Sequence, residues 1–411
     1  MINKYKIIYI NDDAFCFDSD SLKILKINGK KSDIPQKLQN IKLEKATLDD
    51  ELHSSKCSRL VFILTNGCNL NCSYCFYKYD PNRHVGNADV NVLMNRYKEI
   101  AQSFPSGISK IQFFGGEPLI RFNLIKELVS RICEYCDINN YSKPTFGITT
   151  NGLLLDDDKI NFLTENNVYI TISIDGKEKN NNCRLDKNGN PTYNKLVKIV
   201  SHIHDLYPDF PLAAEMTFTN INIDEFYESG IHDIEVLHNL GFNNIHIAPV
   251  ASDDDIINPF GSLFNSDKLF HYLEYAYNYS IESLKTQNPI SLIEFYGVIN
   301  AIKERTYSET FCNAGVNNFT IDYDGTIYSC YTNIGNSHAI IDSNSISISR
   351  NKNYNFRMKD FNSKCIKCWC ESLCNKCDVY STNENFCKYQ RHKYEFFLTK
   401  IISMFFYRGK K

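Results

Sequence analysis

The middle of the chain alternates between short β-rich runs and helix-length segments, and this alternation restricts the fold more than any other feature. Six apolar runs are expected to form strands: Arg59–Thr65, Lys110–Phe114, Thr145–Thr149, Val168–Ile174, Leu212–Thr219 and Asn244–Val250. Helical patterns lie between and after them: Asp89–Phe104, Phe122–Cys136, Asp157–Asn166, Asn194–Leu206 and Ile223–Leu240. Strands separated by helix-length segments pair in parallel through right-handed crossovers. The sequence therefore predicts an α/β fold in which six units form a partial, TIM-like (β/α)6 barrel.

Cysteine is concentrated in two short stretches of the chain. Of the 16 cysteines, most lie in Cys68–Cys75 and Cys365–Cys387. The apolar run near the amino terminus is interrupted by Asn11, Asp12 and Asp13, so we do not expect a signal peptide. Dense cysteine in a chain with no export signal indicates metal binding or redox chemistry rather than a disulfide scaffold.

Charge and hydropathy exclude other classes of protein. The formal net charge of −3 indicates no surface for nucleic acid. No stretch reaches the roughly 20 apolar residues that a membrane-spanning helix needs. The apolar segment Phe396–Tyr407, followed by Arg-Gly-Lys-Lys, is interpreted as a helix packed on the protein, with a membrane-surface helix as the alternative. We expect a cytoplasmic protein that does not span a membrane.

The loop after the first predicted strand carries Cys68, Cys72 and Cys75 in a C-x3-C-x2-C pattern. In a barrel the chemistry lies at the carboxyl ends of the strands, so this loop is expected on the functional rim. Three thiolates on one loop can hold three irons of a 4Fe–4S cluster and leave the fourth iron without a protein ligand. Because a structural cluster normally has a fourth cysteine, the pattern favours a catalytic cluster whose open iron binds a chelating substrate.

The next three strands are followed by loops of small and polar residues. Glycines let the backbone approach a ligand closely, and a carboxylate accepts hydrogen bonds from an ammonium group. Each tetrapeptide alone is typical of an ordinary turn. Their succession after consecutive strands indicates one site on the same rim. The loops are Gly115-Gly116-Glu117-Pro118, Thr149-Thr150-Asn151-Gly152 and Ser173-Ile174-Asp175-Gly176.

The cysteine loop, with Tyr74 before its last cysteine, resembles the signature of radical S-adenosylmethionine (radical SAM) enzymes. The resemblance covers about residues 59 to 250. It implies that the amino and carboxylate groups of S-adenosylmethionine bind the open iron. It also implies that the reduced cluster cleaves this cofactor to methionine and a 5′-deoxyadenosyl radical, which abstracts hydrogen from the substrate. The cofactors then carry the difficult chemistry, and the protein positions them.

The same resemblance assigns residues to these cofactors. It makes Cys68, Cys72 and Cys75 the catalytic cluster ligands, and Glu117 the contact of the methionine amino group. It makes Asn151, Ser173 and Asp175 contacts of the ribose and the methionine carboxylate of S-adenosylmethionine. Arg184 is a further contact of that carboxylate. The full set implied to bind S-adenosylmethionine is Tyr74, Gly115, Gly116, Glu117, Asn151, Ser173, Asp175 and Arg184.

A second group of cysteines lies in the C-terminal third and resembles the SPASM extension, a small domain that carries auxiliary 4Fe–4S clusters. The gap before Cys377 is two residues rather than the usual three, and Cys370 is additional. The first auxiliary cluster, to which the resemblance gives only three cysteines, therefore either has no fourth ligand or takes it from Cys370 or from a carboxylate such as Asp378. The resemblance implies two auxiliary clusters, one held by Cys365, Cys368, Cys374 and Cys387 and the other by Cys312, Cys330 and Cys377.

A zinc site is the alternative for these cysteines. The pairs Cys365-x2-Cys368 and Cys374-x2-Cys377 can close a tetrahedral centre of four thiolates. Beside a radical SAM core, iron–sulfur clusters are the favoured interpretation. We interpret His246 and His271 as packing or surface residues. The remaining cysteines are interpreted as buried apolar residues: Cys16, Cys57, Cys133, Cys136 and Cys183.

The two-part architecture resembles enzymes that modify peptides or proteins. It implies a precursor peptide or protein as partner and an electron donor such as flavodoxin or ferredoxin. The favoured function is a maturase of ribosomally made peptides (RiPPs) that installs a thioether or carbon–carbon cross-link. The enzymatic alternative is a sulfatase-maturing enzyme, which forms formylglycine. In that family an aspartate that serves as a base follows the cysteine of the Gly-x4-Cys motif, whereas Tyr331 follows Cys330 here. A non-enzymatic, cysteine-rich electron carrier or zinc-binding protein is the alternative of another class.

These patterns divide the chain into five expected segments. The first is β-rich, with strands at Lys6–Ile10, Ala14–Asp18 and Leu22–Ile27, and is expected to pair with a peptide or to cap the barrel. The segments are the β-rich extension (1–56), the radical SAM barrel (57–255), a helical bridge (256–305), the iron–sulfur domain (306–395) and a C-terminal helix with a basic tail (396–411).

Overall fold

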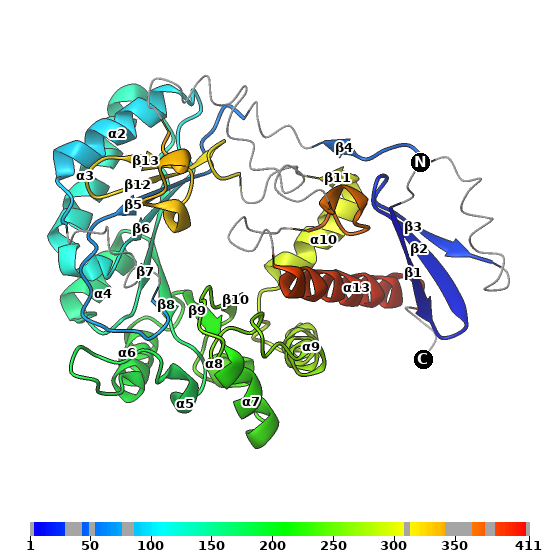
Figure 1. Cartoon of the computed structure of the whole chain (residues 1–411). Helices are drawn as coiled ribbons and strands as arrows, with labels where there is room; N and C mark the ends of the chain where they lie inside the picture. Colours follow the sequence, from blue (N-terminus) through cyan, green and yellow to red (C-terminus); the bar gives the residue numbers. More distant parts are fainter. Residues whose placement is uncertain are drawn as a thin grey trace.

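The computed structural model describes residues 4–28, 43–48, 54–75, 86–307, 313–341, 364–374 and 383–407. Its largest sheet has eight strands in the order β10-β9-β8-β7-β6-β5-β12-β13 (Figure 1). The first six of these pair in parallel, in agreement with the sequence. They are β5 (Arg59–Ile63), β6 (Lys110–Phe114), β7 (Thr145–Thr150), β8 (Val168–Ser173), β9 (Leu212–Phe218) and β10 (Asn244–Pro249). The predicted α/β fold with a partial parallel barrel is confirmed.

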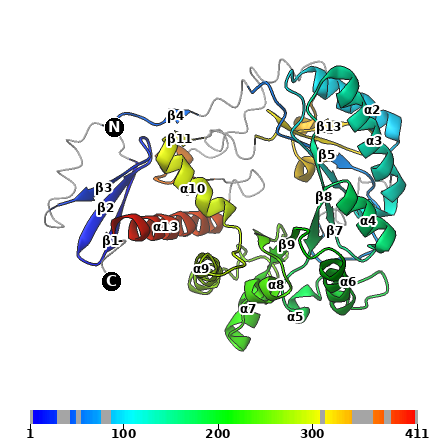
Figure 2. The same ribbon diagram turned by 180° about the vertical axis from the view of Figure 1, so that it is seen from behind.

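One face of this sheet is covered by helices (Figures 1 and 2). The burial of β9 alternates, with Leu212, Ala214, Met216 and Phe218 buried and the residues between them only partly buried. Alternate residues of a strand point to opposite faces, so the partly buried set lies on the concave face. The covering helices are α2 (Val90–Gln102), α3 (Phe122–Asn139), α4 (Asp157–Glu165) and α6 (Tyr193–Leu206), with the short helices η3 (Pro118–Arg121) and α5 (Glu178–Asn181) at the strand ends.

The helix predicted over Ile223–Leu240 is wrong, because two helices occupy this region. The first, α7 (Asn220–Ser229), ends at Gly230, which has a φ of 70°. Glycine reaches this left-handed conformation without the penalty that a Cβ imposes, so it ends the helix. The second, α8 (Asp233–Asn239), begins with a capping box built on His232.

Two strands from the C-terminal region extend the barrel sheet. The strand β12 (Asn318–Ile321) pairs in parallel with β5, and β13 (Ile327–Tyr328) pairs antiparallel with β12. They are followed by η4 (Tyr331–Asn333) and η5 (Ser337–Ala339). The region expected to bind auxiliary clusters is therefore joined to the barrel through the strand that precedes the cysteine loop.

The N-terminal segment forms a three-stranded antiparallel sheet of β1 (Tyr5–Ile10), β2 (Asp13–Asp18) and β3 (Lys23–Ile27), in agreement with the sequence. Phe15 and Phe17 share a second hydrophobic core with Phe397 of the C-terminal helix α13 (Glu384–Phe406) and with Cys370. This core also includes residues of α10 (Ile293–Glu304). The N-terminal sheet thus packs on the C-terminal helix and the cysteine-rich segment.

Further elements complete the described chain. The helix α9 (Ser266–Ser283) packs on α13, and β4 (Thr47–Leu48) pairs in parallel with β11 (Thr306–Tyr307). The helix η7 (Cys365–Lys367) opens the cysteine-rich segment.

The C-terminal helix α13 spans Glu384–Phe406 and begins well before the expected boundary at residue 396. Asn383 supplies the start signal, because its side chain accepts a hydrogen bond from Phe386 N. Leu398 and Ile401 are buried against the second core, so the helix packs on the protein as favoured. Within the described residues, no helix is long and apolar enough to cross a membrane.

Replacement of Phe113 by alanine tests the packing of the barrel sheet. Phe113 is fully buried, and its ring lies 6.4 Å from that of Phe62 and 6.0 Å from that of Phe146. We expect Phe113→Ala to lower the free energy of unfolding by about 3–5 kcal/mol in chemical denaturation. The control Ile138→Ala changes a side chain that is 72% exposed and should shift it by less than about 0.5 kcal/mol. Equal effects of the two variants would contradict this packing.

Candidate functional site

The cysteine loop and the Gly-Gly-Glu-Pro loop are joined by backbone hydrogen bonds. Gly116 N donates to Thr65 O at 2.8 Å, and Glu117 N donates to Gly67 O at 2.9 Å. A Cβ at Gly116 would lie 2.3 Å from Gly67 O, which is closer than side chains approach backbone. Gly115 has a φ of +138°, and a Cβ there would lie 2.4 Å from Thr65 O. The glycines are therefore required by the neighbouring loop, whatever ligand they also face.

Glu117 is completely buried and braces two rim loops. Its Oε1 accepts hydrogen bonds from Thr150 Oγ1 at 2.6 Å and from Leu119 N at 3.0 Å, and its Oε2 accepts one from Asn151 N at 2.8 Å. Burial raises the pKa of Glu117 to about 7, and these three hydrogen bonds oppose the rise. Glu117 thus fixes the position of Asn151. Its contact with the methionine amino group stays a prediction.

Asn151 lies directly beside the first cysteine of the loop. Its Nδ2 donates to Asn69 Oδ1 at 2.8 Å and lies 3.8 Å from Cys68 Sγ. Leu70 N lies 3.4 Å from the same sulfur. Nitrogen donors directed at a sulfur favour its thiolate form, which is the form that binds metal.

The fourth rim loop contacts the cysteine loop through a buried ion pair. Arg184 Nε and Nη2 each donate to a carboxylate oxygen of Asp175 at 2.8 Å, and Thr217 N donates to the same carboxylate at 3.0 Å. Tyr74 donates its hydroxyl hydrogen to Asp175 Oδ2, and the Arg184 guanidinium lies 5.3 Å from the centre of the Tyr74 ring. Asp175, which is 1% exposed, is thus occupied by protein groups and holds Tyr74 and Arg184 in place.

The cysteine loop is also held from its other side. Ser73 N donates to Cys183 O at 2.9 Å, and Asn71 N donates to Leu185 O at 2.8 Å. Cys183 is buried, as expected, and its backbone carbonyl supports the cysteine loop. Ser173 ends β8 and lies on the concave face of the sheet, level with Glu215 of β9.

The surroundings of the three cysteines suit an iron–sulfur cluster, which cysteines bind in their thiolate form. Burial raises the pKa of Cys68 and raises that of Cys72 to about 12, while the positive charge of Arg184 opposes the rise at Cys72. Thiols in such surroundings ionise when a cationic metal centre compensates their charge. The donor set of Cys68, Cys72 and Cys75 therefore suits an iron–sulfur cluster.

Cys330 lies close to this rim. It precedes η4, and Thr332 Oγ1 donates to its sulfur at 3.2 Å. The ring of the next residue, Tyr331, lies 4.8 Å from that of Phe114, which ends β6 directly before the glycine pair. Tyr331 therefore connects the Cys330 turn to the rim.

Cys368, Cys370 and Cys374 belong to the second hydrophobic core, which the N-terminal sheet shares with α13. Cys368 Sγ is 3.5 Å from Cys370 Sγ, and Cys374 N donates to Cys370 O at 2.8 Å. The Cys370 thiol and the nearby Arg391 guanidinium lower the pKa of Cys368. Cys387 lies in the first turn of α13, near the same arginine.

Cys370 is buried beside Cys368 and Cys374, and its role as the fourth ligand of the first auxiliary cluster stays a prediction. Across the described ranges, no three ligating side chains converge on a single-ion site. Cys312, Cys377 and Asp378 lie outside the described residues, so their proposed roles stay predictions.

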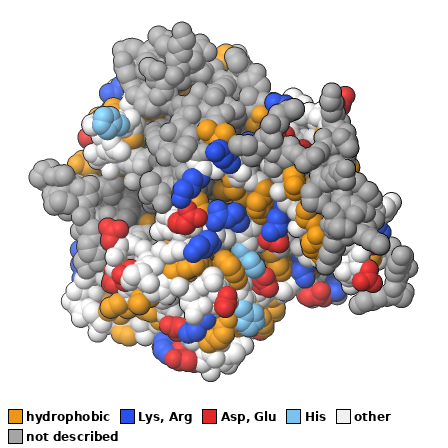
Figure 3. All heavy atoms as spheres, turned by 45° about the vertical axis from the view of Figure 1, so that its right-hand side comes forward, with side chains coloured by type: hydrophobic (Ala, Val, Ile, Leu, Met, Phe, Trp, Pro, Cys, Tyr) orange, Lys and Arg blue, Asp and Glu red, His pale blue; other side chains and the backbone are white. Residues whose placement is uncertain are grey.

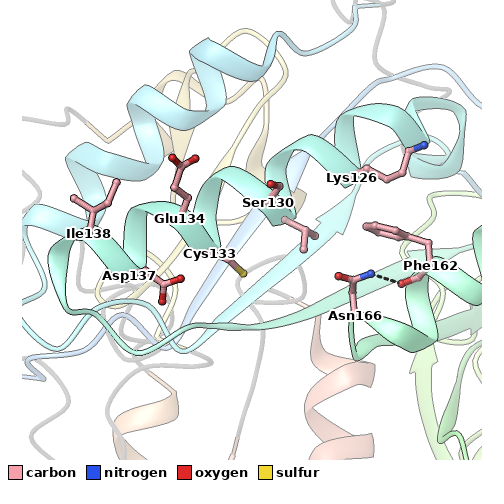
Figure 4. Close-up of a pocket in the computed structure, with 9 residues that line it drawn as sticks. Lys126, Ser130, Cys133, Glu134, Asp137, Ile138, Phe162 and Asn166 are labelled. Atoms are coloured by element: carbon pink, nitrogen blue, oxygen red, sulfur yellow. Dashed lines mark hydrogen bonds between the residues drawn. The ribbon is translucent and has the colours of Figure 1, made fainter.

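A groove of about 500 Å³ lies on the outer layer of helices, between α3 and α4 (Figure 4). It is lined by Lys126, Cys133, Glu134, Asp137 and Phe162, among others. The sheet separates it from the concave face, so it is not part of the rim site.

Sequence reasoning missed an interaction on the concave face. His246 is an exposed surface residue, as the sequence analysis allows, but its Nδ1 also lies 2.8 Å from Glu215 Oε1, a partner that the sequence did not reveal. The two residues are register partners on neighbouring parallel strands, separated by a long stretch of chain. Local spacing cannot detect such a pair, although strand alternation places Glu215 on the face opposite the helices.

Comparison with known proteins identifies the domain that carries the rim. Residues 62–230 match the model of the Radical SAM superfamily. The chain contains a radical SAM domain. Its family implies S-adenosylmethionine and a 4Fe–4S cluster, as the resemblance of the cysteine loop indicated. The match favours an enzyme over a non-enzymatic metal-binding protein.

Relatives extend the similarity beyond this domain. The chain is 24% identical over 375 residues to a cysteine-type anaerobic sulfatase-maturating enzyme of Clostridium perfringens, covering 84% of this chain and 98% of that protein. The match covers only 56% and 47% of two other curated relatives, from Methanocaldococcus jannaschii and Clostridium novyi.

Solved structures share the fold. The structure of anSMEcpe with bound AdoMet and the Cp18Cys peptide has a TM-score of 0.69 and 19% identity, covering 85% of this chain and 98% of that one. Streptococcus suis SuiB bound to the precursor peptide SuiA has a TM-score of 0.55 and 14% identity, covering 92% and 95%.

Replacement of Gly116 by alanine tests the contact between the two loops. The added methyl group would meet Gly67 O, so we expect the cysteine loop to shift and the iron content after anaerobic reconstitution to fall below that of the unmodified protein. Gly297→Ala is the control, because a Cβ there meets nothing within 4 Å. Circular dichroism checks that both variants fold. An unchanged iron content in folded Gly116→Ala protein would contradict the role given to this contact.

Proposed function

We propose that the protein is a radical SAM maturase that cross-links a ribosomally made precursor peptide. The observation that carries this proposal is the meeting of four rim loops around three cysteines. Backbone hydrogen bonds, Asn151 and the Tyr74–Asp175 contact bring each of the other loops to the cysteine loop. Such convergence at the carboxyl ends of parallel strands is where barrel enzymes build their sites.

The residues of the chain have distinct tasks in this proposal. Cys68, Cys72 and Cys75 hold the catalytic cluster, while Asn151 and Leu70 N–H orient and stabilise the first thiolate. When bound, the cluster and S-adenosylmethionine supply a carbon radical that abstracts hydrogen from the substrate. The buried network of Asp175 and Arg184 keeps the rim rigid, so that the cofactors are positioned before the substrate arrives.

A peptide substrate is supported by the neighbours of this fold. The anSMEcpe and SuiB structures that share this fold each contain a bound peptide. The concave face of the barrel presents polar side chains, including Ser173, Glu215 and His246, to the space where a substrate would lie. These polar side chains can form hydrogen bonds with a peptide backbone and its side chains.

Sulfatase maturation is the second candidate. The match to the Clostridium perfringens enzyme favours it, since it covers 84% of this chain. Tyr331 argues against it, because its ring packs on Phe114 at the position where that family carries an aspartate base. We therefore favour cross-linking, with a thioether or carbon–carbon bond as the product.

We also propose that the C-terminal region binds auxiliary 4Fe–4S clusters. Support comes from the closeness of Cys368 to Cys370 and from the position of Arg391 near both Cys368 and Cys387. Cys330 lies beside the rim, where an electron acceptor can reach a substrate radical. An electron donor such as flavodoxin or ferredoxin and a cytoplasmic location complete the proposal.

Intact-mass spectrometry of a short peptide encoded beside this protein tests the function. After co-expression we expect the loss of a hydrogen pair per modified site, and no loss with Cys68, Cys72 and Cys75 replaced together by alanine. The matched control replaces Cys16 of β2 and Cys133 and Cys136 of α3, which lie outside the cysteine loop, and should retain activity. An unchanged mass, although the protein forms 5′-deoxyadenosine, would contradict cross-linking of that peptide. Formylglycine formation from cysteine would instead remove the sulfur.

A further inference from the structure

The concave face carries a histidine–carboxylate pair that the cofactor site does not use. His246 lies on the edge strand β10 and Glu215 on the neighbouring β9, where they are register partners. His246 Nδ1 and Glu215 Oε1 are 2.8 Å apart. Within the part of the chain that the structure describes, only the Nδ1 atom of this ring has a hydrogen-bond partner.

The pair lies level with the cofactor rim. Glu215 pairs with Ser173, the last residue of β8, and all three side chains belong to the same face of the sheet. Neighbouring strands lie about 4.8 Å apart, so His246 is about 10 Å from Ser173 across two strand spacings. Ser173 is one of the residues expected to contact S-adenosylmethionine. The pair is therefore within the reach of a peptide bound beside that cofactor.

The surroundings of His246 leave its ring open to a bound molecule. The side chain is 60% exposed, and it lines a cavity of about 70 Å³ together with Tyr277 and Glu294. Tyr277 of α9 donates to Glu294 of α10 at 2.9 Å, and Lys393 of α13 donates to the same carboxylate at 3.3 Å. Three helices outside the barrel therefore place charged and polar groups opposite the ring. Figure 3 shows that acidic, basic and histidine side chains gather on one face of the molecule among apolar ones.

This arrangement prepares the second ring nitrogen to accept a proton. A carboxylate that accepts a hydrogen bond from Nδ1–H fixes the tautomer in which Nε2 carries the lone pair. The hydrogen bond and charge of Glu215 raise the pKa of His246, and Glu294 adds to the rise, while desolvation by the surrounding protein and the charge of Lys393 oppose it. A base near neutrality that is held by a second residue is suited to proton transfer.

We propose that His246, held by Glu215, is the base that takes a proton from the peptide during cross-linking. The inference rests on the proposed function and adds a residue role to it. In thioether formation, one C–H bond and one S–H bond break and a C–S bond forms. The hydrogen atom goes to the cofactor-derived radical and the thiol proton to His246 Nε2. The remaining electron goes to a one-electron acceptor of the iron–sulfur class. Glu215 is a positioning residue, because it acts through the ring.

The test compares His246→Gln, Glu215→Gln and the control His202→Gln. His202 also pairs with a carboxylate, Asp157, at 2.7 Å, but on the outer helices. With the co-expressed peptide as substrate, we expect His246→Gln to lower the yield of cross-linked peptide about a hundredfold. The formation of 5′-deoxyadenosine should stay within about twofold of the unmodified protein, because the radical step needs no base. His202→Gln should leave both unchanged.

The pH dependence separates a base from a structural residue. The neutral ring accepts the proton, so the cross-linking rate of the unmodified protein should rise with pH through a pKa above 6.5. Glu215→Gln removes the main cause of the raised pKa of His246. The increase in cross-linking rate should therefore occur at a lower pH in this variant. Cross-linking by His246→Gln at the unmodified rate, with the same pH profile, would overturn the proposal.

A substrate-free measurement keeps the inference testable when no peptide is processed. The ring nitrogens of ¹⁵N-histidine-labelled protein are followed by NMR between pH 5 and about 9, a range that spans the ordinary histidine pKa. We expect one ring, absent from the His246→Gln spectrum, to titrate above 6.5 and to titrate lower in Glu215→Gln. Titration at or below 6.5 that does not respond to Glu215→Gln would overturn the pair. Failure of the unmodified protein to form 5′-deoxyadenosine would instead overturn the proposed function.

Discussion

The rim depends on the close backbone contact between the cysteine loop and the glycine pair. Gly116 N and Glu117 N donate to Thr65 O and Gly67 O, so the two loops follow each other as if the strands β5 and β6 continued beyond the sheet. A side chain on Gly116 cannot fit into this space. The position of three thiols is thus set by main-chain geometry, which is less variable than side-chain packing. A cluster that must keep one iron open needs this rigidity, since a shifted loop would change which ligands reach the metal.

Electrostatics complete what the backbone begins. Glu117 and Asp175 are both almost fully buried, and each is satisfied by protein donors. Buried carboxylates are costly unless they are paired or hydrogen-bonded, and a partly satisfied network would allow the loops to move. Here Glu117 joins the second and third rim loops, and Asp175 joins the fourth loop to Tyr74 beside the last cysteine. The polar residues that the sequence assigned to the cofactor therefore also assemble the site that the cofactor would enter.

The sequence predicted the barrel well because its signals are local. Each parallel strand is a short apolar run, and each loop directly follows its strand. The break between α7 and α8 was missed, although Gly230 is a local signal, because the apolar periodicity continues across it. Long-range relations were out of reach: β12 joins β5, and His246 pairs with Glu215, through contacts between distant parts of the chain. The rim residues could be predicted because each loop directly follows a strand in the sequence. The hydrogen bonds between those loops could be seen only in the folded structure.

The most direct test of the central claim is electron–nuclear double resonance on the reduced protein with S-adenosylmethionine labelled at its amino nitrogen and carboxylate oxygen. We expect hyperfine coupling between both labelled groups and the reduced cluster. When Cys68, Cys72 and Cys75 are replaced, we expect the cluster and its coupling to be lost. Such coupling means that the cofactor chelates an iron left open by the three-cysteine loop. The absence of coupling in protein with an intact reduced cluster at these cysteines would contradict it, because the rim would then hold a cluster without presenting an open iron to the cofactor.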